Sequence, residues 1–331
     1  CRAARTDPGA AAEGRRGAMT THLPLGPGAE FDAIRTLLAQ WGPRARGIGD
    51  DGAVLDVPAG SKLVVSTDTT VEHVHFRREW LTPEEIGWRA TMAALSDLAA
   101  MAAAPLGVLL ALTVPAAWRE ALAPIAHGIG EAAAQGDIPI VGGDVTDGDR
   151  LALAITVLGH ATHPLARSGA KVGDTIYVTG RLGGPGAALA AWLDGRAPTP
   201  AHRARFAHPE ARLDASLWCA RHGVTAAIDL SDGLAGDLRH IAAASGICAE
   251  LDLERLPVLD GVPSREALAS GEEYELLVTA PAFDTTAFAA AHAGLALTAI
   301  GQIVAGPAGS VRLLEHGRAV ELPSTHDHFV G

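Results

Sequence analysis

The chain of 331 residues is poor in cysteine and in positive charge, and both scarcities narrow its class. Cys1, Cys219 and Cys248 show no CxxC spacing and no even-numbered disulfide framework. A reducing, cytoplasmic compartment is therefore expected. Lysine and arginine number 26 against 38 aspartates and glutamates, so the net charge is −12. This acidic balance disfavours nucleic acid or an anionic membrane surface as the main partner.

A long apolar membrane segment is also lacking. The stretch Leu98–Trp118 carries no charge and has the length to cross a bilayer. Pro105, Gly107 and Pro115 divide it, however. We therefore expect the end of a helix, a strand and the start of a second helix, and no membrane span.

The N-terminal residues lack the apolar core of a signal peptide. Residues 1–18 are rich in alanine, glycine and arginine, and Met19 follows them. We expect residues 1–27 to be a disordered extension, with Met19 as the native start.

Several familiar site motifs are absent. The chain has no G-x-x-x-x-G-K-[ST], no G-x-S-x-G and no H-E-x-x-H motif. Gly180–Gly186 does not fit the spacing G-x-G-x-x-G, and we interpret it as a flexible strand-to-helix turn. His73 and His75 resemble a zinc pair, but the candidate ligands around them are all oxygens, so zinc is not expected.

Aspartates recur where apolar, β-like runs give way to glycine, serine or threonine. A carboxylate at a strand end is poorly placed for packing but well placed to hold a hard cation. Mg²⁺ prefers oxygen ligands and usually bridges carboxylates to substrate phosphates. Five such segments predict a site for several metal ions and phosphate: Gly47–Asp51, Val64–Asp68, Leu95–Asp97, Val141–Asp144 and Ile228–Asp232.

Each acidic segment also has a purely structural interpretation. For Asp50 we favour an Asx turn between the neighbouring glycines, whereas for Asp51 we favour a functional role. Asp68, Asp97 and Asp232 could each cap a helix instead of binding a ligand. Capping alone does not require carboxylates to recur at so many strand ends, so the segments together favour the metal site.

The order of predicted elements indicates an α/β (α+β) fold with mixed sheets packed against helices. Helices are expected at Glu30–Trp41, from Thr82 towards Met101, and at Ala116–Gln135, Gly186–Trp192, Pro209–Arg221 and Ala282–His292. Strands are expected at Ala53–Val57, Lys62–Ser66, Val108–Val114, Ile138–Val141, Leu151–Gly159, Thr175–Thr179, Ala226–Asp229, Leu276–Thr279, Ala296–Val304 and Val311–Leu314. Loop residues around His160–Lys171 place a domain boundary there, giving domains 28–163 and 164–331.

Taken together, the segments resemble the thiamine-monophosphate kinase family, within the aminoimidazole ribonucleotide synthetase-like superfamily. The resemblance spans Phe31 to Phe329. It is carried by Gly47–Asp51, Ser66–Thr69 with His75-Phe76, Leu95–Met101, Gly142–Thr146, Arg167–Lys171, Ile228–Leu234, Gly271–Leu276 and Asp327–Phe329. The Ser-Thr-Asp-Thr and His-Phe combination separates this family from its relatives in the superfamily.

The resemblance implies a transfer of the γ-phosphoryl group of ATP to thiamine monophosphate, with several Mg²⁺ ions. It also implies a homodimer whose N-terminal sheets join across the interface, with domain 28–163 binding ATP and Mg²⁺ and domain 164–331 completing the site. The implied metal ligands are Asp51, Ser66, Thr67, Asp68, Asp97, Asp144, Asp229 and Asp232. The implied ATP contacts are Gly143, Asp144, Arg167 and Ser231. The implied thiamine monophosphate contacts are His75, Glu272 and His326.

This inventory also suits phosphoryl transfer on chemical grounds. The reaction needs little covalent help from the protein, because positioning and charge neutralisation do most of the work. Arg167 supplies a planar fork suited to phosphate oxygens. The acceptor is itself a phosphate, largely dianionic at neutral pH, so we assign no catalytic base.

Two positions depart from the family pattern. Glu273 stands where the family usually has aspartate, which moves a carboxylate by about 1.5 Å. His326 stands where family members often have an aromatic residue that could stack on thiamine.

Two alternative functions are weaker. A synthetase of the same superfamily, acting on an amide or formyl group, would need a nucleophile or another substrate loop. A regulatory module that binds nucleotide and Mg²⁺ without turnover would not need every carboxylate intact.

Overall fold

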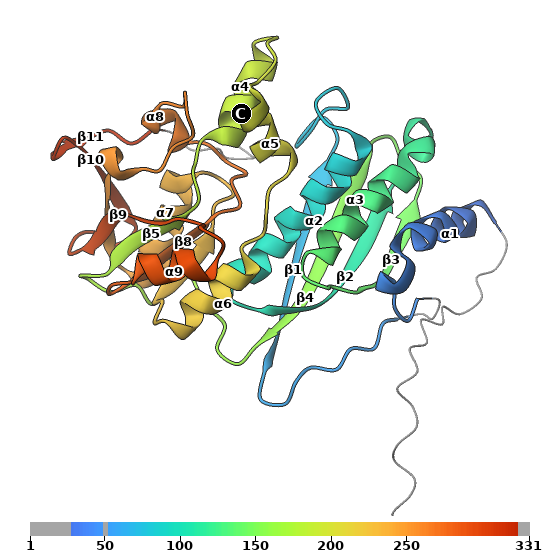
Figure 1. Ribbon diagram of the computed structural model, residues 1–331, viewed down its shortest axis with the longest axis horizontal. Helices are drawn as coiled ribbons and strands as arrows, with labels where there is room; N and C mark the ends of the chain where they lie inside the picture. The colour runs from blue at the N-terminus through green and yellow to red at the C-terminus, as the bar shows by residue number, and fades with distance from the viewer. Residues whose placement is uncertain (1–27, 49–51, 324–331) are drawn as a thin grey trace, which may run out of the picture.

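The computed structural model describes residues 28–48 and 52–323, which form two sheets with their helices (Figure 1). The N-terminal sheet has the strand order β1-β4-β2-β3. Its strands are β1 (Lys62–Val71), β2 (Ala104–Thr113), β3 (Ile140–Thr146) and β4 (Ala152–Ala161). Only β2 and β3 run parallel, and the other pairs are antiparallel. The mixed sheet order predicted from the sequence is therefore confirmed.

Three helices accompany this sheet, namely α1 (Ala29–Trp41), α2 (Pro83–Ala100) and α3 (Leu122–Ala134). The predicted start of α2 is confirmed, because Thr82 and Glu85 form a reciprocal capping box around Pro83. Helices α2 and α3 pack so closely that a Cβ atom on Gly87 would lie 2.2 Å from the carbonyl oxygen of Ile125. Glycine is thus required at this crossing.

The C-terminal sheet has the order β11-β10-β7-β9-β5-β8-β6. Its strands are β5 (Thr175–Thr179), β6 (Ala226–Asp229), β7 (Cys248–Asp252), β8 (Leu276–Ala280), β9 (Leu297–Val304), β10 (Ser310–Glu315) and β11 (Arg318–Val320). The helices of this half are α4 (Gly184–Leu193), α5 (Pro200–Ala207), α6 (Leu213–Arg221), α7 (Leu234–Ser245), α8 (Ser264–Ala267) and α9 (Thr285–Ala291).

Helices α4 and α5 belong to the C-terminal half of the chain but pack on the N-terminal core. Trp192 of α4 stacks on Trp80, with ring centroids 5.2 Å apart and planes inclined by 7°. Phe206 of α5 is buried against both rings. These aromatic contacts hold the two halves together near the N-terminal end of α2. The predicted domain boundary, 163/164, lies near the other end of this helix, where the backbone N–H of Leu165 donates to the carbonyl oxygen of Met101 at 3.0 Å.

Several predicted elements differ from the structure. No strand forms at Ala53–Val57, where Val54 is 95% exposed and has no adjacent strand to pair with. The helix predicted over Ala116–Gln135 begins as a 3₁₀ turn, and its α-helical part starts at Leu122. The helix predicted from Pro209 starts at Leu213. Helices α5, α7 and α8 and strands β7 and β11 were not predicted.

In the described ranges, no helix is both long and apolar enough to cross a membrane. Among the described residues, no helix covers one face of the N-terminal sheet (Figure 1). Leu63 and Val65 of β1 are 50% and 54% exposed on that face. Such an apolar sheet face is typical of a surface that meets another molecule.

Candidate active site

A groove of about 850 Å³ lies between β1 and α2 on one side and α4 with the loop after β6 on the other. Seven of the predicted site residues line this groove. They are Asp68, His75, Asp97, Asp229, Ser231, Asp232 and Glu272. These residues come from both halves of the chain, so the groove depends on how the halves pack.

The alternation of β1 decides which of its side chains reach the groove. Ser66 and Asp68 lie on the face towards α2, where the Ser66 hydroxyl donates to Oδ2 of Asp97 at 2.5 Å. Thr67 lies on the opposite face, with its hydroxyl 3.0 Å from that of Thr156. The structure therefore brings Asp68 to the groove and places Ser66 behind Asp97, whereas the side chain of Thr67 points away.

Burial raises the pKa of Asp97, the charge of Asp68 adds to this effect, and the Ser66 hydrogen bond opposes it. Asp229, at the end of β6, is 5% exposed and accepts a hydrogen bond from Ser96 at 2.7 Å. Burial, together with the charge of Asp97, raises the pKa of Asp229 to about 6. These clustered carboxylates create a site that favours a positive ion.

Arg167 provides a counter-charge to this cluster. It is exposed in the loop between β4 and β5. Its charge partly opposes the rise in the pKa of Asp97 and of Asp229 that burial causes. The hydroxyl of Ser245 donates to its carbonyl oxygen at 3.1 Å and holds the loop on α7. Arg167 therefore acts on the same carboxylates that were predicted to hold metal.

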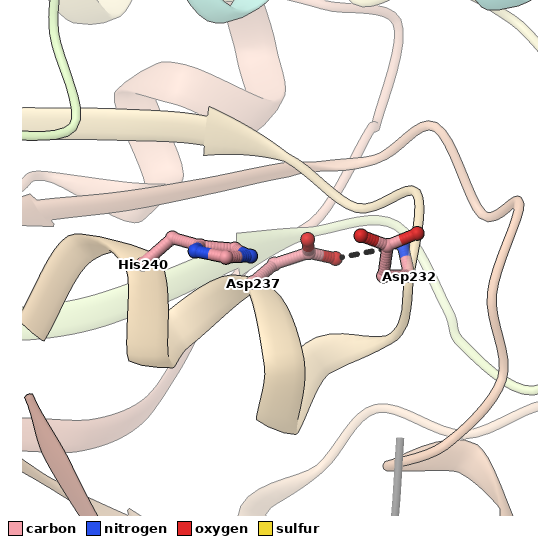
Figure 2. A group of neighbouring side chains, drawn as sticks. All are labelled: Asp232, Asp237 and His240. Atoms are coloured by element: carbon pink, nitrogen blue, oxygen red, sulfur yellow. Dashed lines mark hydrogen bonds between the residues drawn. The ribbon is translucent and has the colours of Figure 1, made fainter. Parts of the chain in front are cut away.

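Asp237 and His240 were not singled out from the sequence but lie beside Asp232 (Figure 2). Asp237 accepts hydrogen bonds from the backbone N–H groups of Ser231 and Asp232 at 3.1 and 3.2 Å. It thereby fixes the loop that carries both predicted residues. The ligand atoms of Asp232, Asp237 and His240 lie within 4.8 Å of one another, close enough to share a cation. Their Asp-x-x-His spacing on α7 was the available signal, because residues three apart share a helix face.

Glu272 and Tyr274 have left-handed backbones, with φ of 59° and 53°. Such angles are rare for residues other than glycine and cluster at functional sites. The backbone N–H of Glu272 donates to Ser231 at 2.7 Å, and that of Tyr274 donates to Leu230 at 2.8 Å. The strained segment is thus tied to the loop after β6, so Glu272 and Ser231 are held together.

His75 follows β1 in a loop and is partly buried at the groove. Its Nδ1 accepts a hydrogen bond from the backbone N–H of Val71 at 3.0 Å. In the neutral ring the proton therefore lies on Nε2. This tautomer makes Nε2 a hydrogen-bond donor.

The structure places Gly143 and Asp144 away from this groove. They line a second, largely apolar hollow of about 590 Å³ between α1 and β3. Asp144 is in register with Thr69 across β2 and β4, which puts it three strands away, or about 14 Å. It also projects from the face opposite to Asp68. Asp51 and His326 lie outside the described residues.

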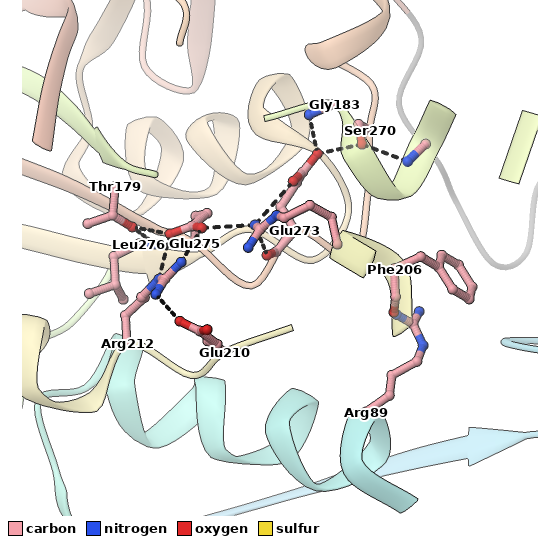
Figure 3. A network of polar contacts seen from close by, with 12 residues as sticks. Arg89, Thr179, Gly183, Phe206, Glu210, Arg212, Ser270, Glu273, Glu275 and Leu276 are labelled. Carbon is pink, nitrogen blue, oxygen red and sulfur yellow. Dashed lines mark hydrogen bonds and ion pairs between the residues drawn. The ribbon is translucent and has the colours of Figure 1, made fainter. Parts of the chain in front are cut away.

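Glu273, which departs from the family pattern, does not face the groove. It is 1% exposed and accepts hydrogen bonds from the backbone of Gly183 and the hydroxyl of Ser270 (Figure 3). Burial raises its pKa to about 7. The extra methylene therefore affects an internal contact and not a ligand.

Comparison with known proteins agrees with this architecture. The description "AIR synthase related protein, N-terminal domain" matches residues 49–161, and the corresponding C-terminal domain matches residues 171–314. The thiamine-monophosphate kinase of Salmonella typhimurium is 38% identical over 301 residues, covering 86% of this chain and 91% of that protein. The chain belongs to the thiamine-monophosphate kinase family.

Solved structures of this family share the fold. The thiamine-monophosphate kinase from Stenotrophomonas maltophilia K279a has a TM-score of 0.76 at 36% identity, covering 86% of this chain and 96% of that one. AaThiL, complexed with AMPPCP and TMP, has a TM-score of 0.73 at 29% identity, covering 90% and 96%. The two-domain fold expected from the resemblance is therefore confirmed.

For this family member, the effect of Mg²⁺ on thermal stability should depend on pH. Asp229 has a raised pKa in the metal-free fold, so protonation favours the folded state. That stabilisation is lost as the pH rises from about 4 through about 6. A cation can replace the proton, so the increase in Tm from Mg²⁺ over EDTA should be larger at about pH 7.5 than at about pH 5.

The control for this measurement is Asp229→Asn, which keeps an acceptor for Ser96 without the charge. In this variant, the increase in Tm from Mg²⁺ should differ less between the two pH values. Equal Mg²⁺ effects at both pH values in the unaltered protein would contradict the metal site.

Proposed function

We propose that this protein transfers the γ-phosphoryl group of ATP to thiamine monophosphate, giving thiamine diphosphate and ADP, in a Mg²⁺-dependent reaction. The observation that carries the proposal is the convergence of seven predicted site residues from both halves of the chain on one groove. The family relatives named thiamine-monophosphate kinase and the AaThiL complex with AMPPCP and TMP support it.

Mg²⁺ fits the donor set of this groove. Asp68, Asp97 and Asp229 offer only oxygen atoms, and burial and mutual repulsion make their unneutralised charges costly. Asp232 adds a further carboxylate to the groove wall. When bound there, Mg²⁺ would neutralise charge on the transferring phosphoryl group and its neighbours.

The transfer itself requires one bond to form and one to break. A terminal oxygen of thiamine monophosphate attacks the γ-phosphorus of ATP in line, and the bond to the β,γ-bridging oxygen breaks, releasing ADP. No proton needs to be removed from a dianionic acceptor, so no residue serves as a general base. The protein binds and orients the two phosphates, with Arg167 and Ser231 meeting ATP, and His75 and Glu272 meeting the acceptor.

His75 is expected to donate from Nε2 to the phosphate of thiamine monophosphate, because Nδ1 is already engaged by Val71. His75→Ala should raise KM for thiamine monophosphate about tenfold and change KM for ATP by less than about twofold. His127→Ala, an exposed substitution on α3, is the control and should change neither value. Equal increases in both KM values, or none, would mean that His75 has only a structural role.

We also propose that the functional unit is a homodimer joined through the uncovered sheet face. Leu63 and Val65 would be buried there. A second copy on this face could also bring its Gly143 and Asp144 to the groove, which the same chain's Asp144 does not reach. Residues 28–163 would then provide the dimer contact and most metal ligands, and residues 164–331 would complete the site.

Cytoplasmic localisation remains a prediction, consistent with the free, buried Cys219 and Cys248.

The experiment that tests the function is the release of ADP with and without thiamine monophosphate. Thiamine monophosphate should stimulate ADP release strongly in the presence of Mg²⁺. ADP release that is independent of it would refute the proposal and favour a different acceptor.

A further inference from the structure

Arg89 is a buried cation on the wall of the groove. It lies on α2 with Ala93 and Asp97, and this four-residue spacing places all three on one helix face. The residue is only 2% exposed. Burying a guanidinium group costs several kcal/mol unless charge and hydrogen bonds compensate it, so its contacts define its role.

Those contacts connect three elements, and Figure 3 shows the one between Arg89 of α2 and Phe206 of α5. Nη1 of Arg89 donates to the carbonyl oxygen of Phe206 at 2.6 Å, and the guanidinium lies 3.9 Å from the centroid of the Phe206 ring. Nη2 lies 2.5 Å from Oε2 of Glu272. The contact between Arg89 and Glu272 is therefore an ion pair and not a hydrogen bond, because Nη2 does not meet the geometry of a hydrogen bond. Helix α5 therefore fixes the guanidinium, and the guanidinium fixes Glu272.

Stability alone does not explain such an arrangement. Buried ion pairs are often no more stabilising than apolar residues of the same volume. Glu272 is also held with a left-handed backbone, and its side chain is 27% exposed towards the groove. A strained, partly exposed carboxylate held by a buried cation is typical of a site oriented for a ligand.

We propose that Arg89 is a positioning residue that fixes Glu272 for recognition of the acceptor substrate. The inference rests on the proposed function, in which Glu272 contacts thiamine monophosphate. Arg89 engages Oε2 of Glu272. This leaves Oε1 of Glu272 to accept a hydrogen bond from thiamine monophosphate. Its charge also offsets that of Glu272, which reduces the repulsion of an anionic phosphate entering an acidic groove.

The test compares two arginines that link α2 to α5. Arg89→Met keeps the length of the side chain but removes the charge, and KM for thiamine monophosphate should rise about tenfold or more, with KM for ATP changed by less than about twofold. Arg89→Lys should recover only part of the loss in KM, because an ammonium group restores the charge but cannot reproduce the planar fork.

Arg203 is the matched control, since it pairs with both carboxylate oxygens of Glu85 at 2.7 Å outside the groove wall. Arg203→Met should lower Tm and leave both KM values unchanged.

A double variant separates positioning from direct contact. Glu272→Gln should raise KM for thiamine monophosphate, and adding Arg89→Met to it should raise KM no further, because Arg89 acts through Glu272. Additive increases would overturn the proposal, and so would variants at Arg89 that lower Tm without changing KM. If Arg89→Met does not fold, Arg89→Lys and Glu272→Gln supply the same comparison. A lack of thiamine monophosphate-dependent ADP release by the unaltered enzyme would instead refute the proposed function.

Discussion

Replacing Asp68 by asparagine should lower kcat by about a thousandfold or more while the protein stays folded. Asp68 lines the groove, and in the proposed function its charge helps to hold Mg²⁺ against the phosphates. Its Oδ1 accepts a local hydrogen bond from the backbone N–H of Thr69 at 2.8 Å. An asparagine oxygen can accept the same bond, so Tm should change little. The measurement is kcat as a function of Mg²⁺ concentration, together with Tm.

Asp284→Asn provides the matched control. Asp284 also accepts local backbone hydrogen bonds, from Thr286 and Ala287 at the start of α9, but it lies away from the groove. This variant should keep its activity. If Asp68→Asn retained full turnover at limiting Mg²⁺, Asp68 would not be a metal ligand.

Asp144→Asn should also nearly abolish turnover, and a mixture of the two inactive variants should recover activity. Asp144 and Asp68 lie on opposite faces of the sheet within one chain. If each site combines Asp68 of one protomer with Asp144 of its partner, a mixed dimer carries one intact site. Random subunit exchange should then restore about a quarter of the unaltered activity.

The exchange can be followed by co-expressing the two variants with different affinity tags and purifying the mixed dimer. This mixed dimer should show about half of the unaltered activity, because one of its two sites is intact. A fully inactive mixed dimer would place both aspartates in the site of the same chain. A monomeric protein would contradict the proposed interface altogether.

The sequence predicted most buried strands, although it missed the interior strand β7, and it predicted peripheral segments poorly. The strands Thr175–Thr179 and Ala226–Asp229 agree with the structure at both ends, since they are short, buried runs bounded by turn residues. Ala53–Val57 shows a similar apolar pattern but has no neighbouring strand. Pairing depends on tertiary contacts, which a local pattern cannot show.

The candidate site shows the same division. Asp68, Asp97 and Asp229 line one groove, but only Asp229 ends a strand as the sequence pattern predicted. Asp68 lies within β1 and Asp97 lies within α2, so the strand-end prediction was wrong for these two positions. The sequence pattern could not place Asp144, because the order of strands in a sheet and the face of each side chain depend on long-range pairing. Arg89 was missed because a lone arginine within a helix gives no motif.

The central claim is that this protein joins a phosphoryl group to thiamine monophosphate. Its most direct test is to incubate the full chain with ATP, Mg²⁺ and thiamine monophosphate and to follow all phosphorus-containing products by ³¹P NMR. The account predicts ADP and thiamine diphosphate in equal amounts, little inorganic phosphate, and no ADP when thiamine monophosphate is omitted. ADP and inorganic phosphate formed at the same rate with or without thiamine monophosphate would contradict it.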